Sequence, residues 1–299
     1  MRLSRLVSQL AERRWRRFYW QRRFMRPETR ERTSARIASR RDQRPDAREA
    51  EASRIAEGLR ESGLVDLGRL LSAGQCAEIK AYLADKEVID HYRPDHATFK
   101  PHGPERHPDC HVAYHRDEDV LAAPYLLAIA NDPAIVDAMH HFFGCRPLLS
   151  YLAAWWSYPT NVAAQQAENF HRDVDDWSFI KLFVYLTDVG PESGPHVYVR
   201  ASAGSPKLGQ IRRFTDEEVI AAFGADALEI KTGEAGSAFV ENTFGLHKGT
   251  KVEQGTRLIF QAVYSLNPLP YSPPGPVAKF DEHLTGDEVA RQLNSIYLA

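Results

Sequence analysis

The sequence predicts a mainly β protein with helical buttresses, in the form of a double-sheet jelly roll. From about residue 147 onward, short apolar stretches rich in β-branched and aromatic residues recur between turn residues such as glycine and proline. Helical patterns gather before that point, and an arginine-rich segment precedes them. Many strands joined by turns, with the helices segregated along the chain, are typical of two packed antiparallel sheets.

The composition is that of an ordinary globular protein. At 299 residues, 43% of them hydrophobic, the chain can bury a sizeable core. It contains no apolar run long enough to span a bilayer, and nothing in it resembles a secretory signal. The three cysteines form no Cys-x-x-Cys pair, which argues against a disulfide framework and a thiolate zinc site. We therefore expect a reducing, cytoplasmic setting.

The net charge of −2 conceals an uneven distribution. Residues 1–60 contain 18 arginines and 8 acidic residues, a net charge of +10. The whole-chain totals of 38 basic and 40 acidic residues leave 20 and 32 for residues 61–299, a net charge of −12. The basic character therefore belongs to an N-terminal extension, which argues against a nucleic-acid-binding core.

The first 25 residues predict a basic amphipathic helix, because apolar side chains recur at roughly helical spacing between arginines: Leu3, Leu6, Val7, Leu10, Trp15, Phe18 and Tyr19. Such a helix suits contact with an anionic membrane surface, a solvated or capping tail, or an organelle-targeting segment. Residues 26–52 are polar and predict a linker or a loosely held helix. We therefore expect a basic, partly disordered extension over 1–52 and one globular domain over 53–299, with its core at about 147–266.

Helix signals occupy the region before the strands. One helix is predicted to begin at Ser72, a second pattern covers residues 120–131, and a third covers 133–143 after the cap residue Asp132. Residues 91–118 contain six histidines at spacings that match no compact metal site. We expect this segment to be a surface loop near the mouth of the active site.

Six strands are predicted in the second half of the chain, over residues 148–158, 179–189, 196–200, 227–231, 237–242 and 257–266. The turn residues 190–195 suggest that the third of these strands returns beside the second as a hairpin. Thr215 and Glu218 form a capping-box pattern before a short helix. These strands would supply most of the jelly roll.

His171 and Asp173 stand just before the strand predicted over 179–189. In an extended segment, side chains two residues apart point to the same face, so an imidazole nitrogen and a carboxylate oxygen would aim at one point. With a further histidine they would make the 2-His-1-carboxylate set of non-haem Fe(II) oxygenases. These two residues are the first candidates for catalytic metal ligands.

His247 is the best candidate for the third ligand, because it lies between Gly245 and Gly249, where the backbone can approach closely. It stands 74 residues beyond Asp173, so only a fold that brings distant strands together could unite the two. Ten residues further, Arg257 opens a strand. Its planar guanidinium could hold the distal carboxylate of a dicarboxylate cosubstrate.

The four candidate residues, in their order and spacing, resemble the site of the Fe(II)/2-oxoglutarate-dependent dioxygenases. The stretches 181–189 and 193–199 look like the bacterial branch of the phytanoyl-CoA dioxygenase family, and the resemblance covers about residues 60–266. One departure is Ser202-Ala203, where relatives often carry a Ser-His pair. That departure affects an outer polar contact and not the metal site.

The resemblance implies a double-stranded β-helix of the cupin type, with Fe(II) held by His171, Asp173 and His247. It also implies that 2-oxoglutarate chelates the iron, that Arg257 binds its 5-carboxylate, and that O2 takes the remaining position. The implied reaction hydroxylates an aliphatic C–H of a small-molecule or lipid-like substrate and releases succinate and CO2. A halogenase would carry Gly or Ala in place of the carboxylate ligand, so Asp173 favours an oxygenase.

Five residues near the ligands have less specific signals. Lys181 lies on the mixed polar and aromatic face of its strand, and either meets 2-oxoglutarate or an acid, or reaches solvent at the strand end. Trp177 either lines the substrate entrance or packs as a core or lid aromatic. Asp175 and Asp176 are expected in a loop over the site, and His196 is expected to be a structural residue of the hairpin.

Two other classes of function remain open. One is a cupin-like metal enzyme that does not use 2-oxoglutarate, against which Arg257 argues. The other is a non-catalytic, membrane-associated protein whose working part is residues 1–25, against which the complete ligand set argues. No adenine-nucleotide or CoA motif identifies the substrate.

Overall fold

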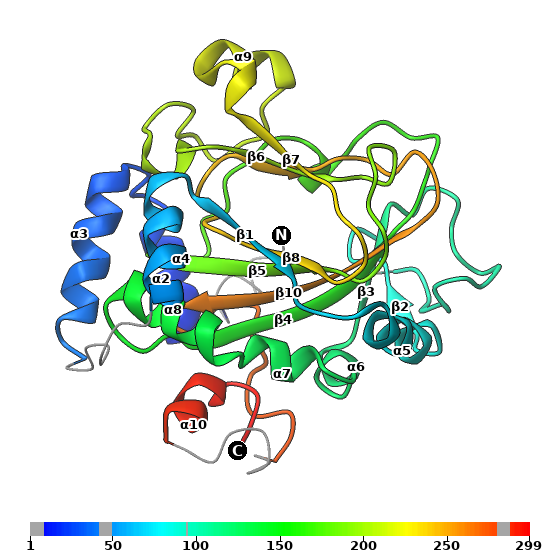
Figure 1. Cartoon of the computed structure of the whole chain (residues 1–299), viewed down its shortest axis with the longest axis horizontal. Helices are drawn as coiled ribbons and strands as arrows, with labels where there is room; N and C mark the ends of the chain where they lie inside the picture. The colour runs from blue at the N-terminus through cyan, green and yellow to red at the C-terminus, as the bar shows by residue number, and fades with distance from the viewer. Residues whose placement is uncertain (1–8, 42–49, 94, 280–287) are drawn as a thin grey trace.

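The computed structural model describes residues 9–41, 50–93, 95–279 and 288–299. These residues form a jelly roll of two facing antiparallel sheets, with helices packed outside the larger sheet (Figure 1). The predicted fold class, mainly β with helical buttresses, is confirmed. None of the helices in this part of the chain is long and apolar enough to cross a membrane.

All six predicted strands are present. Five lie close to their expected ends, and β5 ends at Tyr185 instead of residue 189. The strands are β1 Leu64–Arg69, β2 Val88–Ile89, β3 Val112–His115, β4 Leu148–Ser157, β5 Phe179–Tyr185, β6 His196–Val199, β7 Leu228–Lys231, β8 Ser237–Glu241, β9 His247–Gly249 and β10 Arg257–Ser265. The α-helices are α2 Arg13–Gln21, α3 Pro27–Ala38, α4 Ala50–Glu61, α5 Ala73–Ala84, α6 Asp117–Leu121, α7 Leu126–Ala130, α8 Pro133–Phe143, α9 Asp216–Phe223 and α10 Glu288–Asn294.

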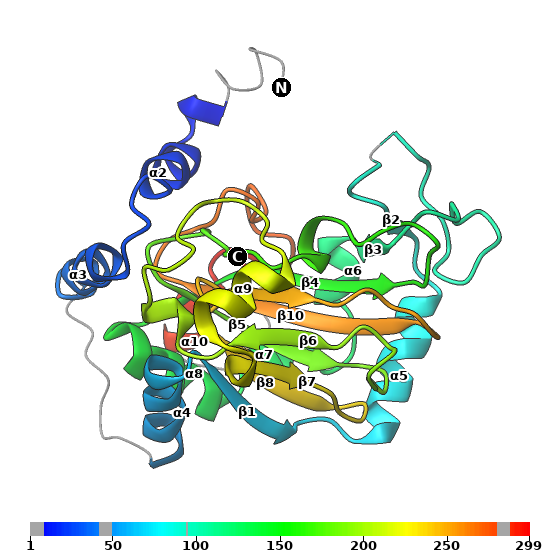
Figure 2. The same cartoon turned by 90° about the horizontal axis from the view of Figure 1, so that it is seen from above.

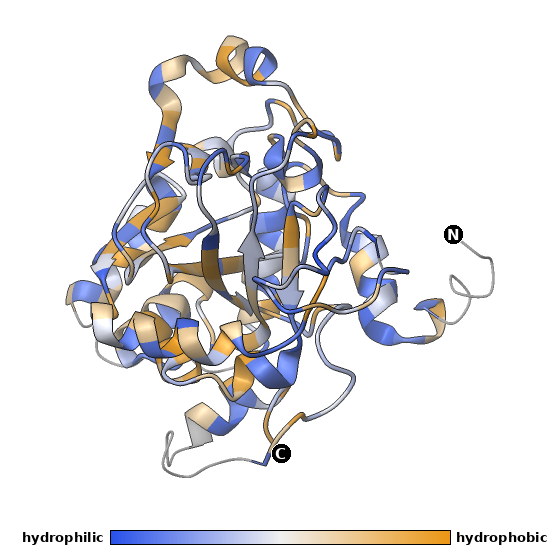
Figure 3. Ribbon diagram, turned by 90° about the vertical axis from the view of Figure 1, so that its right-hand side faces the viewer, coloured by the Kyte–Doolittle hydropathy of each residue, from blue (hydrophilic) through white to orange (hydrophobic). Residues whose placement is uncertain are grey.

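The larger sheet has the strand order β1-β8-β5-β10-β4-β3-β2, and the smaller sheet has the order β7-β6-β9. In β5, the side chains of Ile180, Leu182 and Val184 pack in the main core with α4, α5, α7 and α8, while Phe183 and Tyr185 face the smaller sheet. Alternation along the strand explains this division, as predicted. Hydrophilic and hydrophobic residues also alternate along the covering helices, as expected for helices with one buried side (Figure 3).

The hairpin predicted across residues 190–195 is wrong. β6 pairs with β7 and β9, while β5 pairs with β8 on one edge and with β10 on the other. Because both edges of β5 are occupied, β6 has no edge to join there and crosses to the smaller sheet. Gly194 permits the crossing: its φ is 74°, and an added Cβ would lie 2.7 Å from the Thr250 carbonyl oxygen.

Helix ends follow their local signals. Asp132 caps α8, and capping boxes begin α5 at Ser72 and α9 at Thr215, as predicted. The helix expected over residues 120–131 is instead two short helices, α6 and α7. They are separated where Tyr125 adopts a left-handed φ of 65°.

The polar segment 26–52 was predicted as a linker or a loosely held helix, and its described residues are held more firmly than expected. It contains α3, in which Arg30 is only 3% exposed, and the beginning of α4. Residues 1–8, which open the predicted amphipathic helix, and residues 42–49 lie outside the described residues. The domain boundary at residue 52 therefore stays a prediction.

His115, at the end of β3, is buried and accepts a hydrogen bond from Trp156 Nε1 at 3.1 Å. Burial lowers the pKa of His115 from 6.5 to about 4, because the interior disfavours the charged imidazolium. Between these two pH values the unfolded chain binds more protons than the folded protein. The free energy of unfolding therefore falls as the pH falls through that window.

We expect His115 alone to lower the free energy of unfolding by about 2 kcal/mol between pH 7 and pH 5. In the His115→Gln variant the amide oxygen can still accept from Trp156, so this variant should lack that part of the pH dependence. Urea unfolding of both proteins at the two pH values measures the difference. An equal pH dependence in the two proteins would contradict the assignment.

Candidate metal centre and active-site pocket

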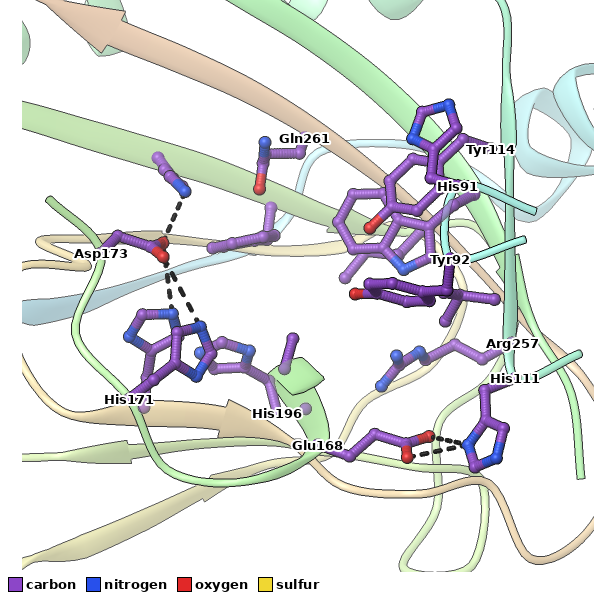
Figure 4. Close-up of a pocket in the computed structure, with 18 of the residues that line it drawn as sticks. His91, Tyr92, His111, Tyr114, Glu168, His171, Asp173, His196, Arg257 and Gln261 are labelled. Atoms are coloured by element: carbon purple, nitrogen blue, oxygen red, sulfur yellow. Dashed lines mark hydrogen bonds and ion pairs between the residues drawn. The ribbon is translucent and has the colours of Figure 1, made fainter. Parts of the chain in front are cut away.

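His171, Asp173 and His247 converge on one point between the two sheets. Figure 4 shows His171 and Asp173 facing each other. Asp173 Oδ1 lies 3.5 Å from His171 Nε2, and Asp173 Oδ2 lies 3.4 Å from His247 Nε2. The three ligand atoms all lie within 4.8 Å of one another. Donor atoms bound at right angles to one metal at about 2.1 Å are about 3 Å apart, so this donor set fits a transition-metal ion.

Backbone hydrogen bonds place these residues. His171 and His247 exchange two N–H···O=C hydrogen bonds of 3.0 Å, and the Asp173 N–H donates to the Thr243 carbonyl at 2.9 Å. His171 is thus held by an isolated bridge in an extended segment, and His247 begins β9. The predicted convergence still occurs, because the bridge keeps the chain extended at His171.

The second ring nitrogens of both histidines face backbone carbonyls. His171 Nδ1 lies 2.9 Å from Asn169 O, and His247 Nδ1 lies 3.0 Å from Gly245 O. A proton on Nδ1 leaves each Nε2 lone pair directed at the cluster, as in protein metal sites. Burial lowers the pKa of His171 to about 3, so this ring is neutral near pH 7. Burial acts the same way on His247, but the Asp173 carboxylate raises the pKa of His247 overall.

Lys181 is buried beside the cluster, with Nζ 2.6 Å from Asp173 Oδ2 and 3.1 Å from Asp175 Oδ2. The interpretation as a strand-end lysine that reaches solvent is wrong, because β5 is paired on both sides at Lys181. Burial disfavours the ammonium, but the two carboxylates outweigh it and raise the pKa of Lys181. Burial also opposes ionisation of Asp173, yet Lys181 and His247 hold its pKa well below the usual value.

Arg257 opens β10 as predicted, and its buried side chain lines the same pocket as the cluster. Nη1 donates to the Gly194 carbonyl and Nη2 to Ser157 Oγ at 3.0 Å. Nε is buried without a hydrogen-bond partner among the described residues. In the view of Figure 4 the guanidinium lies between Tyr92 and Glu168. A buried cation with an unsatisfied donor is suited to binding an anion.

The pocket has a volume of about 420 Å³. One wall is aromatic, since the ring centroids of His91 and Tyr114 lie 4.6 Å apart in a stack and those of Tyr114 and Trp155 lie 5.3 Å apart. The histidine-rich segment reaches the pocket through His91 and His111, although part of it forms β3. His111 is held by Glu168, with Nδ1 2.8 Å from Oε2.

Two residues predicted near the site lie elsewhere. Trp177 does not line the pocket. Its ring centroid lies 5.5 Å from that of Phe24, and the ring packs against the main core. Of the two interpretations given for Trp177, the structure therefore agrees with the core aromatic. Asp176 does not line the pocket either, because its buried carboxylate accepts a hydrogen bond from the Asn267 N–H at 2.8 Å. Residues 175–178 bend instead of continuing a strand, so alternation by two no longer predicts their direction.

The sequence reasoning missed Glu241 and underestimated His196. His196 lines the pocket, and its ring stacks on that of His247 with the ring centroids 5.6 Å apart. Its Nε2 lies 2.6 Å from Glu241 Oε2, but the two groups are not aligned for a hydrogen bond. Glu241 is fully buried, with Oε1 3.8 Å from His247 Nδ1. The sequence contained a signal for Glu241, because this residue lies two positions after Phe239 and therefore on the same face of the strand, the face that meets the smaller sheet.

No protein-family model and no curated protein matches the sequence. Among solved structures, the non-heme α-ketoglutarate-dependent epimerase SnoN from nogalamycin biosynthesis is 22% identical with a TM-score of 0.54, over 72% of this chain and 83% of that chain. HygX from Streptomyces hygroscopicus, with nickel and 2-oxoglutarate bound, is 16% identical with a TM-score of 0.47, over 73% of this chain and 87% of that chain. EctD from S. alaskensis is 17% identical with a TM-score of 0.49, over 75% of this chain and 80% of that chain.

The similarity to SnoN supports the fold. None of the three structures is named as a phytanoyl-CoA dioxygenase, so that finer resemblance stays a prediction. At 22% identity the likeness to SnoN concerns the fold alone. The chain thus shares a jelly-roll fold with an α-ketoglutarate-dependent enzyme, and its own residues form a candidate metal centre between the sheets.

Proposed function

We propose that this protein is an Fe(II)- and 2-oxoglutarate-dependent oxygenase that hydroxylates an aliphatic C–H bond. The observation that carries the proposal is the placement of two histidine nitrogens and one carboxylate oxygen within 4.8 Å, in the same pocket as the buried Arg257. Two imidazoles and one carboxylate that leave coordination positions open are the donor set of non-haem iron oxygenases. The arginine adds a site for an anionic cosubstrate.

In this proposal His171, Asp173 and His247 hold Fe(II), and Arg257 binds the 5-carboxylate of 2-oxoglutarate. When bound, iron, 2-oxoglutarate and O2 together supply the oxidant for the C–H bond, and succinate and CO2 are released. Lys181 fixes the orientation of the Asp173 carboxylate by donating to Oδ2 at 2.6 Å. The aromatic wall excludes water and positions the substrate.

The pocket favours a compact substrate over a long acyl chain. Among the described residues, its aliphatic lining is limited to Val112, Ala167 and Ile259. Tyrosine, tryptophan, histidine and other polar side chains make up most of the remainder. Such side chains stack on rings and hydrogen-bond to hydroxyl or amine groups, whereas an acyl chain needs an aliphatic channel. We therefore propose a polar, ring-bearing small molecule and not a lipid-like one.

Anaerobic calorimetric titration of 2-oxoglutarate into the Fe(II)-loaded protein tests the role of Arg257. We expect Arg257→Ala to weaken binding by at least about 30-fold, because removing one partner of a buried charge pair costs about 2 kcal/mol or more. Arg213 is the matched control, since it is exposed and its charge acts on His171 from outside the pocket. Arg213→Ala should change the affinity by less than about fivefold.

Equal affinities of the wild-type protein and Arg257→Ala for 2-oxoglutarate would contradict the proposal. That result would favour the cupin-like metal enzyme that uses no 2-oxoglutarate. Binding that is lost in Arg213→Ala as well as in Arg257→Ala would indicate a general electrostatic effect and not a contact with the 5-carboxylate.

A further inference from the structure

We infer that the arginine-rich N-terminal extension is a built-in support of the metal centre, in which Gln21 and Arg30 clamp the two loops that carry the proposed ligands. Residues 171–177 and 243–247 form these two ligand loops. The inference rests on the proposed function only in calling the loop residues metal ligands. Helices α2 and α3, which supply the clamp, lie at one end of the larger sheet together with α4 and α8 (Figures 1 and 2).

The first ligand loop is held by hydrogen bonds to its backbone. Gln21 Nε2 donates to the Val174 carbonyl at 2.6 Å, and Arg30 Nη2 donates to the Asp176 carbonyl. Arg30 Nη1 also donates to Gln21 Oε1 at 2.8 Å, so the two side chains act as one unit. Gln21 is 0% exposed and Arg30 is 3% exposed, so water does not compete for these contacts. Val174 directly follows the proposed ligand Asp173.

The second ligand loop is held through Phe244. The Arg30 guanidinium lies 4.5 Å from the centre of the Phe244 ring, and the Arg172 guanidinium lies 5.5 Å from it. A desolvated cation over an aromatic face is strongly attracted. Arg172 also donates to the Phe244 carbonyl at 2.6 Å and to the Ser202 carbonyl at 2.9 Å. Phe244 therefore joins the extension to the loop that ends in His247.

The two ligand loops are also joined to each other. The Asp173 N–H donates to the Thr243 carbonyl at 2.9 Å, and His171 and His247 exchange two hydrogen bonds of 3.0 Å. A displacement of either loop is therefore passed to all three proposed ligands. Such sites function only when the groups stay within about 0.5 Å of their geometry. The amide of Gln21, 153 residues before its partner, thus contributes to positioning the metal ligands.

These contacts change the interpretation of the basic extension. A buried guanidinium is costly unless its donors are satisfied. Here Nη2 of Arg30 donates to the Asp176 carbonyl of a ligand loop, and Nη1 donates to Gln21 Oε1 and the Phe24 carbonyl. Arg14 Nη1 fastens α2 at a second place, by donating to the Ser272 carbonyl at 2.9 Å. We therefore expect loss of the clamp to weaken the metal centre, which a purely localising or targeting segment would not do.

Hydrogen–deuterium exchange of the full-length, metal-free protein tests the clamp. Arg30→Met keeps most of the side-chain length and removes the donors, while Gln21→Met removes the amide alone. In both variants we expect at least about tenfold faster exchange in the two ligand loops, with β5 unchanged. Arg32→Met, an exposed position on the same helix, is the matched control and should leave exchange unchanged in all segments.

Titration with Co(II) provides a second readout. Loss of groups that support metal ligands typically weakens metal binding by about 10–100-fold, so we expect that effect in Arg30→Met and none in Arg32→Met. Arg30 lines a cavity of about 300 Å³, through which a guanidinium ion can reach the vacated position. Millimolar guanidinium should therefore restore slow loop exchange and Co(II) affinity to Arg30→Ala, but not to Gln21→Met.

Unchanged exchange in both ligand loops of Arg30→Met would overturn the clamp. Faster exchange throughout the protein, β5 included, would overturn it as well, because general destabilisation would then explain the result. Absence of Co(II) binding by the wild-type protein would overturn the proposed function instead. The exchange measurement would still decide the clamp in that case, since it uses metal-free protein.

Discussion

Asp173→Ala should release succinate from 2-oxoglutarate at least about 10³-fold more slowly than the wild-type protein in the presence of Fe(II) and O2. Loss of an outer partner of a metal site typically costs 10–100-fold, and loss of a ligand itself costs more. The substitution removes the carboxylate from the three ligand atoms that lie within 4.8 Å of one another. Mass spectrometry of succinate in reactions with and without Fe(II) measures the effect.

Asp175→Ala is the matched control for this prediction. Asp175 lines the same pocket and also contacts Lys181, at 3.1 Å, but it is not one of the three clustered ligand residues. We expect this variant to retain most of the Fe(II)-dependent turnover. Full Fe(II)-dependent turnover by Asp173→Ala would contradict its role as a ligand. Equal losses in the two variants would indicate that buried charge, and not metal ligation, is what matters.

Lys181→Met should lower the free energy of unfolding of the metal-free protein by about 3–5 kcal/mol at neutral pH. Lys181 is buried in β5, and its ammonium contacts the carboxylates of Asp173 and Asp175. Without the ammonium, two carboxylates are left in the interior with no compensating cation. Removing one partner of a buried ion pair therefore lowers the free energy of unfolding by far more than the intact pair contributes to it. Urea unfolding of metal-free protein measures this loss.

This loss of stability should shrink as the pH falls toward 4. In the wild-type protein Lys181 helps to hold the pKa of Asp173 below its unfolded value of 3.8. The ionised Asp173 therefore stabilises the folded protein above pH 3.8, and this stabilisation is lost as the pH falls through the folded pKa. In the variant, burial raises the pKa of the carboxylate, which becomes neutral in mild acid.

Lys231→Met is the control for this prediction. Its partner Asp66, at 2.5 Å, is 59% exposed, so the loss in the free energy of unfolding should be about 1 kcal/mol or less. Equal losses at Lys181 and Lys231 would contradict the prediction.

The candidate ligands could be proposed from the sequence because their signals are residue type and order. His171 and Asp173 stand two residues apart, His247 lies between two glycines, and Arg257 opens an apolar strand. The two faces of β5 and the caps of α5, α8 and α9 were predictable for a similar reason. Alternation and capping depend on neighbours within about four residues.

Other features depend on groups that are distant in the chain. Trp177 and Asp176 lie within a bend, so their directions are set by the core and by Asn267 and not by strand parity. Glu241, on β8 of the larger sheet, approaches His196 on the smaller sheet, and Arg30 reaches the first ligand loop from the N-terminal extension. Local patterns do not predict which distant partner a buried polar side chain will meet.

The sequence by itself determined six of the ten strands described, the two faces of β5, and the residue types of the candidate metal centre. The tertiary structure alone decided that β6 joins β7 and β9, and that the N-terminal extension supports the ligand loops. The physical reason is the same in both cases. A strand joins whichever sheet edge is unoccupied, and a buried donor takes whichever acceptor is unsatisfied, and both are settled only when the rest of the chain has packed.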